Sequence, residues 1–151
     1  VNFGRLLEES PQAKAAQAAL ESEFLPRQRD VAAQRKALQE KVDKLQKEAA
    51  VMSEADRVRN EREVRDLELN VNRRFNELQE DLNLRRNEEV GRMQRALLQE
   101  VQAYARANGY QLVVSDGVLY AAEGIDITPQ LVAAIKAKAP AAAATRVAVA
   151  S

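Results

Sequence analysis

The sequence contains neither cysteine nor histidine. Their absence excludes thiol nucleophiles, imidazole bases and the usual zinc ligand sets, so carboxylates are the main catalytic groups left. The five glycines are too widely spaced to form a phosphate-binding loop. Paired acids such as Glu88 and Glu89 fall in a stretch with helical periodicity, where they are expected to face solvent. We therefore predict that the chain is not an enzyme and has no catalytic residue, no metal site and no cofactor.

An excess of charge of one sign is also missing, because 23 Lys and Arg balance 23 Asp and Glu. Together with an aromatic content of 4%, this balance argues against a specific nucleic-acid partner, which basic surfaces and aromatic stacking recognise. No apolar run approaches the roughly 20 residues that span a bilayer, and no signal peptide heads the chain. Since position 1 is Val and not Met, we expect a processed or trimmed start, which is compatible with export.

What the sequence does contain is long charged and aliphatic stretches, a composition typical of coiled coils. Apolar residues recur at every seventh position at Phe24, Val31, Leu38, Leu45 and Met52, which predicts a helix that needs a partner helix. A single amphipathic helix on a globular core is the alternative, but little apolar material remains elsewhere to build that core. Asn108-Gly109 is expected to end a second helix, whose apolar stripe falls at Val64, Leu67, Val71, Phe75, Leu78, Leu82, Met93, Leu97, Val101 and Tyr104.

The two stripes predict a long antiparallel helical hairpin, or arm, with its tip near residues 51–54. Ser53 can cap the second helix at this tip, because its side-chain oxygen can accept a hydrogen bond from a free backbone N–H. Pro26 lies inside the first stripe, where it removes one helical hydrogen bond. We expect either a kink near residues 22–26 or a restart of the helix at Pro26.

The segment after the second helix changes character and predicts a β-hairpin. Two short β-like runs, Gln111–Ser115 and Val118–Ala122, flank Asp116-Gly117, a pair that suits a type I′ turn. Such a hairpin is marginal alone, so it needs further strands. Several copies of the chain would have to share one sheet or barrel to hide the strand edges.

The start of the chain is expected to join this hairpin. The first helix would extend about 60 Å and the second about 80 Å, so the second overshoots and returns to the N-terminus. Residues 1–3 then form a short strand and residues 4–10 a small helix, while Thr128 caps a short C-terminal helix with Pro129 in its first turn. The predicted domains are a β-rich body (1–10 and 105–138), the helical arm (11–104) and an Ala/Pro-rich tail (139–151).

Three segments of the chain are distinctive: "VNFGRLLEESPQAKAAQAALESEF" at the start, "RRNEEVGRM" in the second helix and "LVVSDGVLYAAEGIDITPQLVAAIK" near the end. Together they resemble the Skp/OmpH family of periplasmic chaperones. Each segment alone is moderately specific, but their order around a long helical hairpin is distinctive. The resemblance covers nearly the whole chain, to about residue 138.

The resemblance implies a mainly α fold with a small β component and a jellyfish-like homotrimer. The β-barrel body is assembled from terminal strands of three chains, and three helical arms enclose a cavity. Such proteins hold unfolded outer-membrane proteins in the periplasm without ATP before membrane insertion. The trimer-interface residues expected on this basis are Val1, Phe3, Leu112, Val113, Val114, Leu119 and Tyr120.

One property departs from the family pattern. Familiar members are strongly basic, whereas this chain has a net charge of zero. Electrostatic capture of clients, of lipopolysaccharide or of anionic membrane is therefore only a weak expectation for this chain.

The client-binding candidates are apolar residues that lie off the helix seams. Leu69 and Leu84 lie away from the second stripe on a helical wheel, and Val51, Met52 and Val58 cluster at the predicted tip. A flexible, promiscuous surface of this kind suits unfolded clients, although scattered surface hydrophobes are the ordinary alternative.

Two further interpretations stay open at this point. Arg85 and Arg86 are candidate charged contacts to clients, but they could equally brace neighbouring helices. The main rival to a chaperone is a structural trimeric coiled-coil tether or adaptor that binds no client.

Overall fold

The computed structural model describes the backbone of residues 1–147, with side chains up to residue 138. The chain is mostly helical with two long helices, as the sequence predicts. It divides into two compact units: a hairpin unit, Leu20–Arg86, and a terminal unit formed by Val1–Ala19 and Asn87–Ser151. The helices are α1 (Phe3–Glu9), α2 (Pro11–Glu48), α3 (Glu54–Ala107) and α4 (Thr128–Val147).

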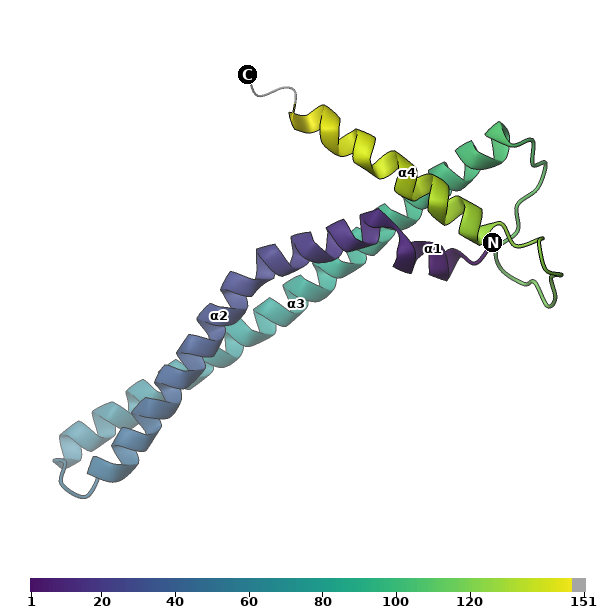
Figure 1. The fold of residues 1–151 in the computed structure, drawn as a ribbon. Coiled ribbons are helices and arrows are strands. Elements are labelled where there is room, and N and C mark those ends of the chain that lie inside the picture. The colour runs from purple at the N-terminus through teal and green to yellow at the C-terminus, as the bar shows by residue number, and fades with distance from the viewer. Residues whose placement is uncertain (148–151) are drawn as a thin grey trace. The chain divides into compact units, whose positions relative to one another are not determined.

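In the hairpin unit, α2 and α3 run antiparallel to each other (Figure 1). They pack along a narrow apolar seam. Phe24 and Val31 of α2 are buried with Leu78 of α3, and Leu20, Phe75 and Leu82 flank this cluster. These are residues of the seven-residue stripes, whose spacing keeps one side of each helix facing its partner. The guanidinium of Arg35 lies 4.0 Å from the centre of the Phe75 ring, so a cation covers the rim of the seam.

The helix α2 continues through Pro26, so the predicted restart at that residue is wrong. Proline lacks an N–H and costs the helix one hydrogen bond, but contacts with α3 hold both flanks of Pro26 in place. Three ion pairs cross between the helices here: Glu23–Arg85 at 3.3 Å, Arg27–Asp81 at 2.7 Å and Asp30–Arg74 at 3.1 Å. Each contributes only about 0–1 kcal/mol because it is solvated, so the burial of Phe24 beside them remains the larger stabilising term.

The tip of the hairpin is a short turn over residues 49–53. The Ser53 Oγ accepts a hydrogen bond from the Asp56 N–H at 3.2 Å, which confirms Ser53 as the cap of α3. Helix α2 ends at Glu48, a few residues before the predicted tip. The backbone N–H groups of Val51 and Met52 bond to the last carbonyl of α2, that of Glu48, and so lead the chain into the turn.

The terminal unit has a small core of its own. Residues Leu131 and Ile135 of α4 are buried against Leu6 of α1 and against Leu97 and Val101 of α3. The apolar positions at the start of α4 recur at helical spacing, so within residues 128–138 one face is covered while Gln130, Ala133 and Lys136 are exposed. The remaining members of this core are Ile127 and Val132, with Val1, Phe3, Leu7, Tyr104 and Val113 partly buried against it.

The end of α3 is closed by a glycine cap, as predicted. Gly109 has a φ of 74°, a left-handed conformation that a residue without a Cβ adopts at little cost. The Tyr110 N–H bonds to the carbonyl of Ala105, and the Gly109 N–H bonds to that of Arg106, which is the Schellman arrangement. The ring of Tyr110 stacks on that of Tyr104 at 6.4 Å, so the cap directs the chain back across the terminal unit.

The predicted β-hairpin does not form within the single chain. Residues 108–127 contain turns and irregular segments, and no strand occurs anywhere in the described residues. The type I′ turn is also wrong, because Gly117 has a positive φ of 76° whereas Asp116 does not, and type I′ requires positive φ at both positions. Two short runs with no neighbouring strand gain too little from pairing to be stable.

The two ends of the chain also differ from the expectation. Phe3 begins the helix α1 and does not belong to a strand, because the Asn2 side chain accepts a hydrogen bond from the Arg5 N–H and caps the helix there. At the other end, α4 continues to Val147, so the predicted tail begins as helix. Residues 148–151 of that tail lie outside the described part of the chain.

Replacing Phe24 tests the seam. Phe24 is 1% exposed, so Phe24→Ala should lower the free energy of unfolding by about 3–5 kcal/mol through lost burial and a cavity. Its neighbour Leu25 is 44% exposed, and Leu25→Ala should cost less than about 0.5 kcal/mol. Urea unfolding followed by far-ultraviolet circular dichroism measures both, and equal losses would contradict the assigned seam.

Candidate functional site

The terminal unit exposes a cluster of large apolar side chains along residues 110–125. Leu119 is fully exposed, and Tyr120 and Leu112 are 84% and 77% exposed. Single exposed hydrophobes are normal on a protein surface, but a contiguous group marks an interaction surface. We call this group the apolar loop surface; its members are Tyr110, Leu112, Val114, Val118, Leu119, Tyr120 and Ile125.

Side chains alternate along the first part of this surface. Leu112 and Val114 are exposed, whereas Val113 between them is partly buried against the core of the terminal unit. Such alternation is the pattern of a strand with one covered face. The backbone nitrogen of Val1 donates a hydrogen bond to the Val114 carbonyl at 2.9 Å, so the start of the chain already contacts this segment.

A groove with a volume of about 620 Å³ runs beside the apolar loop surface. Its walls are the first residues of the chain, Val1–Gly4, and parts of the segment between Tyr110 and Ile127. Half of its lining residues are aliphatic, and Phe3 and Tyr110 add aromatic surface, so apolar side chains from another molecule can pack against much of this groove. The groove and the apolar loop surface therefore form one candidate site for assembly.

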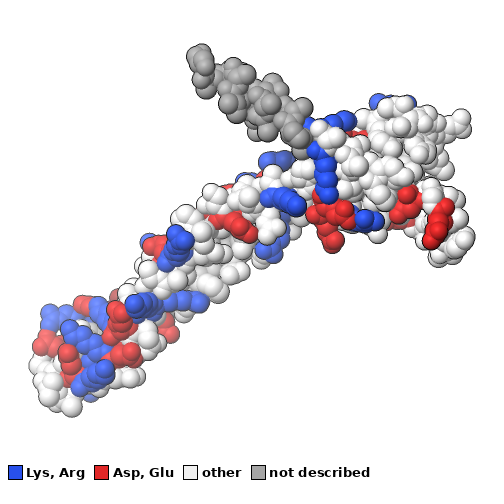
Figure 2. All heavy atoms as spheres, in the orientation of Figure 1, with Lys and Arg blue, Asp and Glu red and all other residues white. Residues whose placement is uncertain are grey.

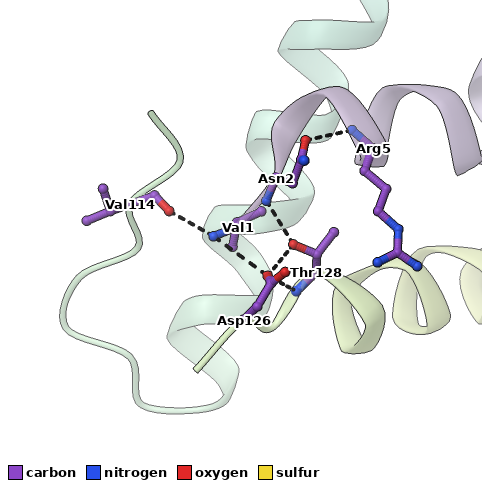
Figure 3. Close-up of polar contacts among 6 residues, drawn as sticks. All are labelled: Val1, Asn2, Arg5, Val114, Asp126 and Thr128. Carbon is purple, nitrogen blue, oxygen red and sulfur yellow. Dashed lines mark hydrogen bonds and ion pairs between the residues drawn. The ribbon is translucent and has the colours of Figure 1, made fainter. Parts of the chain in front are cut away.

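A polar cluster ties the N-terminus to the start of α4 beside this groove (Figure 3). The Asn2 N–H donates to the Thr128 Oγ1 at 2.8 Å, and the Thr128 hydroxyl donates in turn to Asp126. The Thr128 N–H also donates to Asp126, at 2.9 Å. We expected Thr128 to cap α4, but it is the first residue of that helix, and its hydroxyl serves a long-range contact.

The electrostatics of this cluster follow from its geometry. The hydroxyl and the backbone N–H of Thr128 lower the pKa of the Asp126 carboxyl below its ordinary value, and the N-terminal ammonium and Arg5 act in the same direction. Thr128 is completely buried, which strengthens its hydrogen bonds. The Asp126 carboxylate thus accepts two hydrogen bonds from Thr128, and these bonds hold the wall of the groove in place.

Of the predicted interface residues, the structure exposes some and packs others into the chain itself. Leu112, Val114, Leu119 and Tyr120 lie on the apolar loop surface, whereas Val1, Phe3 and Val113 contact the core. Sequence reasoning missed the following members: Tyr110, Val118 and Ile125. These three residues lie next to predicted turn residues, and that position indicates an exposed side chain because no buried partner is expected there.

The predicted client-binding residues all lie in the hairpin unit, and most are exposed. The exposed fractions are 85% for Val51, 70% for Leu69, 58% for Leu84 and 44% for Val58. Met52 is only partly exposed, because its sulfur lies 3.7 Å from the side-chain amide of Asn60. These residues do not converge on a pocket but are spread along the hairpin.

Basic and acidic side chains are interspersed on the face of the hairpin unit that Figure 2 shows. The Lys41 ammonium pairs with Glu63 at 2.5 Å across the two helices and lowers the pKa of that carboxyl. Arg85 pairs with Glu23 across the helices, which agrees with the bracing role considered for it, while Arg86 is exposed. The surface of the hairpin is therefore polar, neutral and dotted with single apolar side chains.

Among the described residues, no group of acidic side chains is arranged to hold a metal ion. No helix there is both long and apolar enough to cross a membrane.

Comparison with known proteins yields one family and several relatives. The family model described as outer membrane protein (OmpH-like) matches residues 1–135. The chain is 27% identical to the Chaperone protein Skp of Pectobacterium atrosepticum, in a match that covers 90% of this chain and 83% of that protein. It is 26% identical to the protein of the same name from Yersinia enterocolitica, covering 90% and 84% respectively.

The polar cluster predicts a pH dependence of stability. Since the pKa of Asp126 is lowered in the folded chain, the carboxylate stabilises the fold above its ordinary pKa of 3.8, and this contribution is lost as the pH falls through the lowered value. Asp126→Asn should therefore flatten the decline of the urea midpoint between about pH 5 and pH 2. The exposed Asp116 provides the control, and an Asp116→Asn variant with the same flattening would contradict the assignment.

Proposed function

The chain belongs to the OmpH-like outer membrane protein family, and from this premise we propose that it is an ATP-independent periplasmic chaperone. It holds unfolded outer-membrane β-barrel proteins and prevents their aggregation before membrane insertion. The observation that carries this proposal is the distribution of exposed apolar side chains on the neutral hairpin unit. The names of the relatives, Chaperone protein Skp, support the same function.

The hairpin surface suits weak contact with many sequences. Val51, Leu69 and Leu84 are exposed singly between charged residues, so each can cover one apolar side chain of a client without forming a tight pocket. A protein that binds the unfolded state withdraws it from aggregation by mass action and needs no nucleotide. Affinity spread over many weak contacts also lets the client change its conformation while it is held.

The apolar loop surface supports the proposal that the chain assembles into a homotrimer. An exposed apolar group of this kind is covered in most stable proteins, and the described part of the chain supplies no cover for Leu119 or Tyr120. In a trimer, residues 111–122 of each copy would find the neighbouring strands that the single chain lacks. The three hairpins would then hold one client together in a cavity between them.

Net charge sets a limit on the partners. The equal numbers of basic and acidic residues and their mixing on the face of the hairpin shown in Figure 2 give lipopolysaccharide or anionic membrane only weak electrostatic attraction to the chain. Apolar contact with the client is therefore the term on which holding depends.

The oligomeric state provides the first test. Light scattering should return three times the chain mass of 16.8 kDa. Leu119 is fully exposed, so Leu119→Asp leaves the core of the terminal unit untouched and should lower the measured mass to that of one chain at micromolar concentration. Leu69→Asp, the same change on the hairpin, should keep the trimer mass. A parent protein that is already monomeric would overturn the assembly.

Aggregation assays test the holding surface. Replacing Val51, Met52, Val58, Leu69 and Leu84 together with Ser should raise the amount of protein needed for half suppression about fivefold, which corresponds to a loss of about 1 kcal/mol shared by five weak contacts. The measurement is light scattering of a urea-unfolded outer-membrane β-barrel protein diluted into buffer without nucleotide. The control variant carries Ser at Arg29, Lys36, Gln46, Arg62 and Glu68.

The effect of salt separates apolar from electrostatic holding. Several hundred millimolar salt screens exposed charge pairs, so it should weaken protection less than the five Ser substitutions do. If the apolar variant protects as well as the parent while salt abolishes protection, charged residues hold the client. If neither parent nor variant protects any unfolded protein, the chain acts as a tether.

A further inference from the structure

The outer side of α3 in the hairpin unit carries an unusual row of uncharged side chains. Val64, Val71 and Leu78 recur every seven residues on the side that faces α2, so the positions five residues further on face away from it. These outer positions are Leu69, Asn76 and Asn83, and Asn72 and Gln79 lie between them. All are exposed. We call this row the amide strip; it consists of Leu69, Asn72, Asn76, Gln79 and Asn83.

The other helix of the same unit differs at the equivalent positions. On α2, counted from Phe24, the outer residues are Arg29, Lys36 and Asp43, as is usual for the solvated side of a coiled coil. The six amides of α2 are all glutamine and none lies at these outer positions, whereas α3 contains six asparagines. The amide strip is therefore a feature of the outer positions of α3.

The asparagines of the amide strip, Asn72, Asn76 and Asn83, make no hydrogen bond within the described part of the chain. Two other asparagines of α3 do, because Asn60 donates to the Asp56 carbonyl and Asn70 accepts from Arg73. Asparagine is also a poor helix former, because its side chain competes for backbone hydrogen bonds. A helix that carries several such residues at exposed positions breaks a local rule without a gain in stability, which indicates an external partner.

The chemistry and length of the strip define that partner. Each amide offers both a donor and an acceptor, which matches the paired N–H and C=O groups of an unfolded backbone better than it matches a charged ligand. From Leu69 to Asn83 the strip extends about 21 Å along the helix, the length of about six residues of extended chain. Leu69 at one end and Leu84 beside the other are exposed apolar contacts.

We propose that the amide strip docks an extended, uncharged stretch of unfolded polypeptide, with client backbone groups bonded to Asn72, Asn76 and Asn83 and apolar client side chains against Leu69 and Leu84. This inference rests on the proposed holding function and assigns it a face of the hairpin. Recognition of the backbone is independent of sequence, so the strip binds extended segments of many clients. A folded protein, whose backbone groups are already paired, is not bound.

Binding of a fluorescently labelled, urea-unfolded outer-membrane β-barrel protein to the full chain tests the proposal. The triple variant Asn72→Ala/Asn76→Ala/Asn83→Ala should bind about tenfold more weakly, because three amide partners are removed while helix propensity rises. The matched control, Gln28→Ala/Gln39→Ala/Gln46→Ala, removes three exposed amides of α2 and should change the Kd less than about twofold. Equal binding by parent and strip variant, or equal losses in both variants, overturns the inference.

The same assay separates a failure of the amide strip from a failure of the proposed holding function. If the parent binds no unfolded β-barrel protein, the proposed function fails and the strip fails with it. If the parent binds and the strip variant binds equally well, only the strip is wrong.

A single fluorophore locates the contact without removing the strip. Because the chain has no cysteine, Asn76→Cys and, as control, Lys36→Cys each give one labelling site for an environment-sensitive dye. Adding the unfolded client should shift the emission at position 76 and not at position 36. The proposal is overturned if the emission shifts at position 36 alone or if it shifts at neither position while the client still binds. It is also overturned if the emission at position 76 shifts when the client is added already folded in detergent. A shift on concentrating the labelled chain without client would instead assign the strip to a second copy.

Discussion

The narrow apolar seam between α2 and α3 is the contact on which the hairpin unit depends. It consists of one apolar side chain for about each helical turn, with Phe24, Val31 and Leu78 at its centre. Because this seam uses most of the apolar residues of the unit, the outer surfaces are left polar. The ion pairs around Pro26 add little energy each, but they fix which turns of the two helices face each other. A thin seam and a long solvated surface are two consequences of the same composition.

The terminal unit faces the opposite situation, since it has more apolar surface than one chain can cover. Leu131 and Ile135 complete a small core with Leu6 and Leu97, and between Gly109 and Asp126 only Val113 packs against it among the described hydrophobic residues. The cluster around Thr128 holds the N-terminus against this segment, so the exposed side chains occupy a defined groove wall. The unit thus has a stable framework and an uncovered apolar surface, a combination that favours assembly over independent function.

The two surfaces differ in how their apolar side chains are arranged. On the hairpin, charges of both signs keep the surface hydrated, so the proposed contacts of isolated apolar and amide side chains with an unfolded chain are weak and numerous. On the terminal unit, apolar side chains are contiguous, so contact there can be extensive and stable. In the proposed chaperone, durable contacts join copies of the chain and transient contacts hold the client. The family match over residues 1–135 covers both surfaces.

Features that depend on residues close together in the sequence could be predicted before the structure was known. The seven-residue stripes predicted the long helices, Ser53 and Asn108-Gly109 predicted their ends, and off-seam positions predicted the exposure of Leu69 and Leu84. Tertiary structure alone decided the features that need a distant partner. Contacts with α3 carry α2 through Pro26, Asn2 and Asp126 engage the Thr128 hydroxyl, and residues 111–122 remain without strands in a single chain. The physical reason is that a helix satisfies its own backbone within a few residues, whereas a buried hydroxyl or a strand edge requires groups far away in the sequence or on another molecule.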